Sequence, residues 1–215
     1  MSAKNVEHKF IVPNSVEVRD YQVNLANQAK NENCLIILPT GLGKTVVALH
    51  VIADYLTKGN GGVLFLAPTK VLVNQHYEFL KNTLAIDDIA LITGEDLLTK
   101  RKKLWINSVI CATPEITRND IARKIVDTTQ FNLIIFDEAH RAVGDYAYVE
   151  IAKQLNKSNI RLLGMTATLP SEKEKAKEIC DNLHVRDLAE RNDSSPDVKP
   201  YIQETKTEWV TVDLS

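Results

Sequence analysis

The sequence predicts an α/β protein built on a doubly wound, mainly parallel sheet. Six short apolar runs lack polar alternation, as strands buried on both faces do: 34–38, 63–67, 89–92, 108–112, 132–136 and 161–165. Segments with helical periodicity follow them near 45–57, 70–82, 95–105, 115–126, 145–156 and 172–182. Because strands and helices alternate, right-handed crossovers should place helices on both faces of the sheet.

The chain length bounds the domain organisation. At 215 residues, the chain suits one well-cored domain with a small extension. We expect the domain over residues 1–185 and a C-terminal extension over 186–215, where polar residues become dominant. Within that extension, residues 206–214 alternate like an edge strand. The last predicted helix should begin with a capping box formed by Ser171 and Glu174.

Composition is that of an ordinary soluble globular protein, with 44% hydrophobic and 25% charged residues. The net charge of −2 gives no support for nucleic-acid binding, so any such surface must be a local patch. The scattered cysteines Cys34, Cys111 and Cys180 are expected to be reduced, the first two as small buried hydrophobes. No run approaches the ~20 apolar residues that span a bilayer. These features predict a cytoplasmic protein, nucleoid-associated if it is archaeal, with no membrane partner.

The segment LPTGLGKT directly follows the first predicted strand and opens the first long helix. It matches the phosphate-loop pattern except that Leu38 replaces the first glycine. Two glycines let backbone N–H groups face phosphates, Lys44 can reach the β- and γ-phosphates, and the Thr45 hydroxyl can ligate Mg²⁺. The alternative is a tight strand-to-helix turn with a solvated lysine. The predicted nucleotide-binding residues of this loop are Pro39, Thr40, Gly41, Leu42, Gly43, Lys44 and Thr45.

A second motif, NLIIFDEAH, places two carboxylates at the carboxyl end of a predicted strand, the edge where open α/β sheets bind ligands. Asp137 would hold Mg²⁺ through water, and Glu138 would orient the attacking water. His140 lies too far along to reach the metal and would bridge to neighbouring loops. The alternative is an acidic helix start stabilised by the macrodipole. Together with the upstream loop, the motif predicts a catalytic set of Lys44, Asp137, Glu138 and His140.

These motifs resemble those of superfamily 2 DEAH-box helicases, and the resemblance covers nearly the whole chain in the expected order. PTGLGKT, DEAH and Thr166-Ala167-Thr168 are similar to motifs I, II and III. Further similarities are VRDYQ (18–22), APTKVLVNQH (67–76), TG (93–94) and ATPE (112–115). The tracts at 137–148 and 194–201 resemble the archaeal Hef helicase–nuclease and Fanconi anaemia M branch. The resemblance implies a RecA-like P-loop NTPase domain that uses ATP and Mg²⁺.

The resemblance also implies roles for single residues. Gln22 would hydrogen-bond adenine and Arg19 would stack on or contact the base, which selects ATP. Thr166 and Thr168 would couple the nucleotide state to the grip on DNA. Nucleic-acid backbone contacts would come from Thr69, Lys70, Thr93, Gly94, Thr113 and Pro114, and would be salt-sensitive and weakly sequence-specific. For Thr69 and Thr113 the alternative is plain helix N-capping.

In this superfamily the ATP site lies between two RecA-like domains, and no second one is recognisable after Thr168. The sequence therefore predicts the first motor domain of a helicase or translocase that acts on forked or branched DNA, with the second domain as a missing partner. Alone, it should bind ATP and turn it over very slowly. One alternative is a nucleotide-gated sensor of duplex RNA or DNA. Another, a small-molecule phosphotransferase, leaves the motifs after the phosphate loop unexplained.

Overall fold

The structure is a computed structural model that describes residues 4–59, 61–157 and 159–202. These residues form a seven-stranded sheet in the order β3-β4-β2-β5-β6-β1-β7, and every neighbouring pair is parallel. The prediction of a parallel α/β sheet is confirmed. The strands are β1 (Cys34–Ile37), β2 (Gly62–Leu66), β3 (Ile89–Ile92), β4 (Val109–Ala112), β5 (Phe131–Asp137), β6 (Arg161–Thr166) and β7 (Asp187–Glu190).

The six predicted helices are confirmed, and a further one, α1, precedes β1. They are α1 (Asp20–Ala29), α2 (Lys44–Lys58), α3 (Lys70–Thr83), α4 (Leu98–Leu104), α5 (Pro114–Ala122), α6 (Ala147–Leu155) and α7 (Lys173–Asn182). Short 3₁₀ turns are η1 (Thr128–Gln130), η2 (Ala139–Arg141) and η3 (Lys199–Tyr201). Among the described residues, none of these helices combines the length and the apolar character that crossing a bilayer demands.

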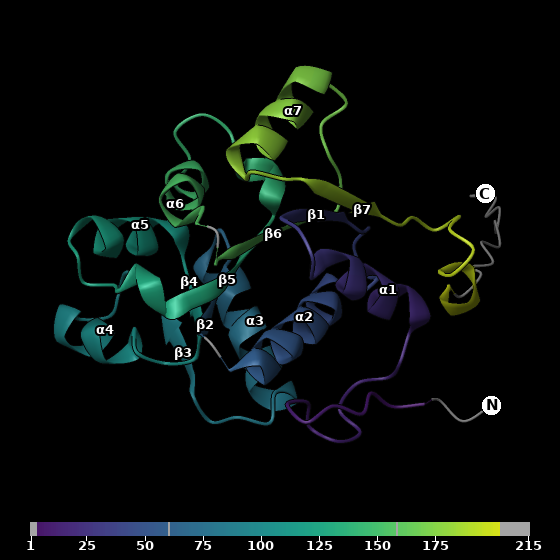
Figure 1. The fold of residues 1–215 in the computed structure, drawn as a ribbon, viewed down its shortest axis with the longest axis horizontal. Helices are drawn as coiled ribbons and strands as arrows, with labels where there is room; N and C mark the ends of the chain where they lie inside the picture. The colour runs from purple at the N-terminus through teal and green to yellow at the C-terminus, as the bar shows by residue number, and fades with distance from the viewer. Residues whose placement is uncertain (1–3, 60, 158, 203–215) are drawn as a thin grey trace, which may run out of the picture.

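Two hydrophobic cores lie on opposite faces of the sheet, because successive residues of a strand point to opposite sides. In β2, Phe65 belongs to the core under α1, α2 and α3, whereas Leu64 and Leu66 belong to the core under α5, α6 and α7. Figure 1 shows these two helix groups on either side of the sheet. Both faces of the central strands are therefore dry, which explains their unbroken apolar sequences.

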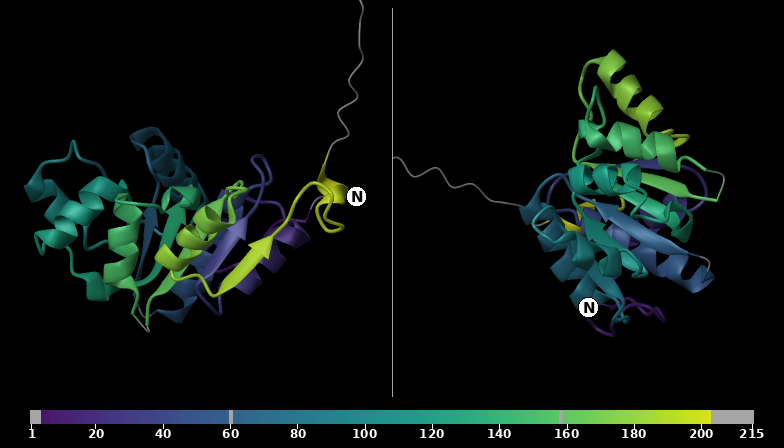
Figure 2. Two further views of the ribbon diagram at one scale, coloured as in Figure 1. Left: turned by 90° about the horizontal axis from the view of Figure 1, so that it is seen from above. Right: turned by 90° about the vertical axis from the view of Figure 1, so that its left-hand side faces the viewer.

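Strand β7 forms one edge of the sheet, beside β1, as the view from above in Figure 2 (left) shows. It lies within residues 186–215, which the sequence assigned to a C-terminal extension, and of its four residues only Ala189 is buried. That pattern is too short and too polar to stand out in the sequence. The alternating stretch 206–214 lies outside the described residues.

The predicted capping box of the last helix is wrong. Helix α7 begins one residue later than expected, with Glu172 at the N-cap position and no side-chain cap. Ser171 therefore precedes the cap, and Glu174 falls one position short of the site from which it could reach back. The cysteines follow the prediction: Cys34 and Cys111 are buried thiols, and burial raises the pKa of Cys34 to about 12.

Candidate functional site

Most of the predicted site residues gather at the edge of the sheet where the parallel strands end. The strand order divides this edge into two halves. The segments that follow β3, β4 and β2 hold the residues predicted to contact nucleic acid; this is the β3–β4–β2 half. The segments that follow β5, β6 and β1 hold the phosphate loop, the DEAH motif and the coupling threonines; this is the β5–β6–β1 half. The two halves meet at the neighbouring strands β2 and β5.

The phosphate loop curls into a cradle between β1 and α2. Gly43 is the N-cap of α2 and has a left-handed backbone with φ +81°, which favours glycine. A Cβ added there would overlap the Nε2 atom of Gln22. The Lys44 ammonium donates to the carbonyl of Leu38, 3.1 Å away, so the residue that replaces the usual first glycine holds the lysine at the loop's base. Curled loops of this kind can turn backbone N–H groups toward an anion, and phosphate binding here stays a prediction.

The predicted base-reading residues lie against the outside of this loop. Gln22 is 2% exposed and donates to the carbonyl of Leu42, while its Oε1 atom has no partner within the described part of the chain. Tyr21, to which the sequence gave no role, donates to the same carbonyl at 2.8 Å. Arg19 lies over the ring of Tyr201, its guanidinium carbon 5.7 Å from the centroid. The unpartnered oxygen of Gln22 is an acceptor of the kind that an adenine amino group would need. Contact of either residue with adenine stays a prediction.

The two predicted Mg²⁺ ligands are brought together by a residue that the sequence did not single out, His76 on α3. Its Nε2 lies 2.8 Å from Oδ2 of Asp137, and its Nδ1 lies 3.4 Å from Oγ1 of Thr45. A hydroxyl and a carboxylate are hard oxygen donors of the type that Mg²⁺ takes alongside substrate phosphates. No cluster of three or more His, Cys, Asp and Glu side chains suited to a metal occurs in the described ranges.

Tyr148 on α6 fixes the end of the strand that carries Asp137. Its hydroxyl lies 2.7 Å from the Asp137 carbonyl and 3.2 Å from the Leu66 carbonyl, and so ties β5 to β2. Burial raises the pKa of Tyr148 well above its ordinary value, so this tyrosine remains a proton donor. It lies in the tract 137–148 that suggested the family branch, although the sequence gave it no role of its own.

The remaining DEAH residues form a series of polar contacts that leads to the coupling motif. Glu138 has a left-handed backbone, φ +52°, which is uncommon for a residue with a side chain. Its carboxylate lies 3.3 Å from Nδ1 of His140, and the same nitrogen lies 3.0 Å from Oγ1 of Thr166. Thr166 in turn donates to the carbonyl of Thr168 at 2.8 Å. The prediction that His140 bridges to a neighbouring loop is confirmed.

In the β3–β4–β2 half, Thr69 caps α3 by accepting from the Leu72 amide at 3.2 Å. The capping interpretation is therefore confirmed for Thr69. At the equivalent position before α5 the Thr113 side chain makes no such bond, so capping by its side chain is wrong. Pro114 is the first residue of α5, as expected.

The loop after β3 is tied to its surroundings by charge pairs. Lys70 pairs with Glu95 across the edge, and both side chains are largely exposed. The Thr93 amide donates to the carboxylate of Asp96, which closes the turn around Gly94. Because an exposed pair is weak, an anion such as a phosphate could displace Glu95 from Lys70 at little cost.

Beneath this loop lies a buried ion pair that the sequence did not suggest. Arg101 of α4 makes two hydrogen bonds to Asp120 of α5, at 2.8 and 3.1 Å, and also donates to the carbonyl of Asp96. The indole of Trp105 donates to the same Asp120 carboxylate. Asp120 is fully buried and Arg101 is 7% exposed. The pair fixes the Gly94 turn to both helices.

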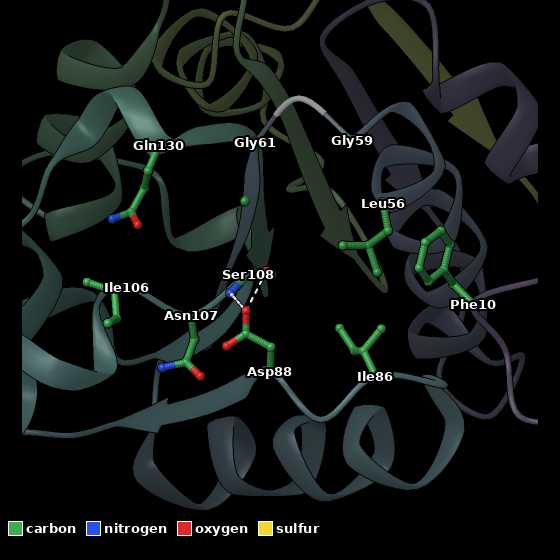
Figure 3. A pocket seen from close by; sticks show the side chains of 11 residues that line it. Phe10, Leu56, Gly59, Gly61, Ile86, Asp88, Ile106, Asn107, Ser108 and Gln130 are labelled. Carbon is green, nitrogen blue, oxygen red and sulfur yellow. Dashed lines mark hydrogen bonds between the residues drawn. The ribbon is translucent and has the colours of Figure 1, made fainter.

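A hollow of about 400 Å³ lies at the opposite edge of the sheet, where the strands begin (Figure 3). Phe10, Leu56 and Ile86 line one side of it, and the carboxylate of Asp88 accepts from the backbone and hydroxyl of Ser108. None of the predicted site residues lines it.

Comparison with known proteins agrees with this geometry. The family model of the DEAD/DEAH box helicases matches residues 19–176. The ATP-dependent DNA helicase fml1 of Schizosaccharomyces pombe is 35% identical over 99% of this chain and 26% of its own length. A Methanocaldococcus jannaschii protein, MJ1505, provisionally named an ATP-dependent RNA helicase, is 42% identical over 97% of this chain and 27% of its own length.

Among solved structures, the helicase domain of Pyrococcus furiosus Hef superposes with a TM-score of 0.87 at 42% identity. That match covers 92% of this chain and 43% of the Hef chain. The chain thus spans about a quarter of the curated relatives above and under half of the Hef helicase domain. The fold, the ordered motifs and the family match agree, and the chain belongs to the DEAD/DEAH box helicase family.

Proposed function

We propose that this chain is the ATP-binding first motor domain of an ATP-dependent DNA helicase or translocase that acts on forked or branched DNA. The observation that carries the proposal is the arrangement around His76, which joins Thr45 of the phosphate loop to Asp137 of the DEAH motif. This arrangement lies in a chain that belongs to the DEAD/DEAH box helicase family. Two hard oxygen donors and a lysine at the base of a phosphate-sized cradle are the parts that a magnesium nucleotide needs.

Each group has a task in this site. Lys44 and the loop amides would hold the phosphates, and Thr45 with Asp137 would hold Mg²⁺, which when bound neutralises charge on the phosphates. Glu138 would orient and polarise the attacking water. The polar contacts from Glu138 through His140 to Thr166 would pass the nucleotide state to the neighbouring loop. Fast hydrolysis would need an arginine from a second RecA-like domain, a contribution of about 10³- to 10⁵-fold.

The nucleotide site is tested by replacing Gly43 with alanine. The added methyl would overlap the Gln22 amide and would force a left-handed alanine, a strain of roughly 1–3 kcal/mol. The backbone strain lowers stability, whereas the overlap displaces Gln22 and distorts the loop, so ATP affinity is expected to fall about tenfold, which is ~1.4 kcal/mol. The measurement is a titration of the chain with a fluorescent ATP analogue in the presence of Mg²⁺.

Gly59→Ala is the matched control for that variant. Gly59 ends the same helix with φ +68°, but an added Cβ there meets nothing within 4 Å. It shares the backbone strain and lacks the clash, so stability should fall while ATP affinity stays at the wild-type value. Unchanged affinity in Gly43→Ala would contradict the proposed cradle.

A second candidate, a nucleotide-gated sensor of duplex RNA or DNA, is favoured by the name of the M. jannaschii relative. A competition experiment distinguishes the helicase proposal from the sensor proposal. Branched DNA, duplex DNA and duplex RNA compete for the full-length protein, and binding is measured by fluorescence anisotropy at fixed salt. We expect branched DNA to compete best, since fml1 and two MPH1 relatives, 35–37% identical to this chain, are named DNA helicases. A preference for duplex RNA would replace the DNA proposal with the sensor.

A further inference from the structure

His76 lies inside the proposed nucleotide site although neither the phosphate loop nor the DEAH motif contains it. It stands on the buried stripe of α3 with Val73 and Leu80, and it is 9% exposed. Its ring packs against that of Phe65, with 4.5 Å between centroids. The imidazole reaches from α3 across the carboxyl end of β2 to the two predicted metal ligands.

The partners of the two ring nitrogens assign their roles. A carboxylate only accepts, so Nε2 carries the proton and donates to Asp137 at 2.8 Å. In the neutral imidazole Nδ1 is then the acceptor, and the hydroxyl of Thr45, 3.4 Å away, is the donor. When the Thr45 proton points at His76, both lone pairs of that oxygen are turned away from the ring. One side chain thus orients a hydroxyl and a carboxylate at once.

Packing alone would not call for an imidazole at this position. An apolar ring could cover Phe65, and it would avoid the cost of placing polar nitrogens in the core. Both nitrogens of His76 find polar partners instead, and each partner is a predicted ligand of the same ion. Groups that orient metal ligands in this way change metal affinity by about 10- to 100-fold when they are removed.

We propose that His76 is a positioning residue that sets Thr45 and Asp137 in the geometry that Mg²⁺ requires, without touching the metal itself. The inference rests on the proposed function, because it concerns the same site. Helix α3, which also carries Lys70, would then help to position the ligands of the Mg²⁺ that accompanies the nucleotide.

The test is a Mg²⁺ titration of binding of a fluorescent ATP analogue to the wild-type chain and to His76→Phe, His76→Gln and His76→Asn. Phenylalanine keeps a ring against Phe65 and removes both hydrogen bonds. We expect it to raise the Mg²⁺ concentration at half-saturation by about tenfold or more, while binding without Mg²⁺ is unchanged. Glutamine, whose amide can reach Asp137, should lie closer to wild type than asparagine.

His50→Phe is the matched control, because His50 is a partly buried histidine on α2 that contacts none of these ligands. It should leave the Mg²⁺ midpoint in place. A wild-type midpoint in His76→Phe would overturn this inference and leave the proposed function standing. If that variant fails to fold, equal midpoints in the glutamine and asparagine variants would overturn it. A wild-type chain whose ATP binding ignores Mg²⁺ would overturn both proposals.

Discussion

Replacement of Glu138 by glutamine in the full-length protein is expected to reduce ATP turnover by about 10²- to 10⁴-fold, the usual contribution of a positioned acid or base. Glu138 has a left-handed backbone, and its carboxylate lies 3.3 Å from Nδ1 of His140. Glutamine keeps the shape of this side chain and cannot take up a proton from water. Phosphate release at saturating Mg²⁺ and ATP, with and without DNA, measures the effect.

Two other variants give this result its meaning. Lys44→Ala should abolish turnover by loss of nucleotide binding, whereas Glu138→Gln should bind the ATP analogue as tightly as wild type. Glu172→Gln, an exposed carboxylate beside Lys175 at the start of α7, should leave turnover unchanged. Wild-type turnover in Glu138→Gln would remove this residue from the chemistry.

Substitution of Asp120 by asparagine is expected to lower the free energy of unfolding by about 3–5 kcal/mol. The change keeps the volume of the side chain and removes its charge, so the Arg101 guanidinium is left buried without a counter-ion. Trp105 loses a charge-assisted acceptor at the same time. Urea unfolding followed by circular dichroism measures the loss.

Asp181→Asn provides the comparison, because Asp181 pairs with Lys177 on the exposed face of α7. An exposed pair adds little, so its loss should leave the unfolding midpoint unchanged. Replacing Arg101 and Asp120 together with apolar residues should recover part of the stability, since no unpaired charge then remains. Equal stability of Asp120→Asn and wild type would mean that the pair does not hold the Gly94 turn.

The sequence predicted those strands and helices whose buried residues form a recognisable apolar pattern. Strands β1 to β6 were predictable because the central strands are dry on both faces, which leaves unbroken apolar runs such as that of β5. Strand β7 escaped notice because at the sheet edge it needs only Ala189 to face the core. Helix α1 was not predicted because its buried face is not purely apolar: it contains Gln22 beside Tyr21 and Leu25. Its start, VRDYQ, was interpreted only as a motif.

The candidate site divides in the same way. Residues at strand ends could be located from the sequence, because parallel strands bring their carboxyl ends to one edge whatever lies between them. His76 could not, since its partners lie 31 and 61 residues away and the turns of α3 decide which side it faces. Arg101 and Asp120 read as ordinary surface charges, and only the packing of α4 on α5 makes them a buried pair.

The division of the carboxyl edge into two halves has a consequence for how such a domain can diversify. The loops after β3 and β4 follow strands that lead neither to the phosphate loop, nor to the DEAH motif, nor to α3, so insertions there would leave the proposed nucleotide cradle intact. Loop changes of this kind are tolerated better than changes in the elements they connect. The strand order therefore lets the loops beside Thr93 and Thr113 vary in length and sequence without a change in the residues of the phosphate loop or the DEAH motif.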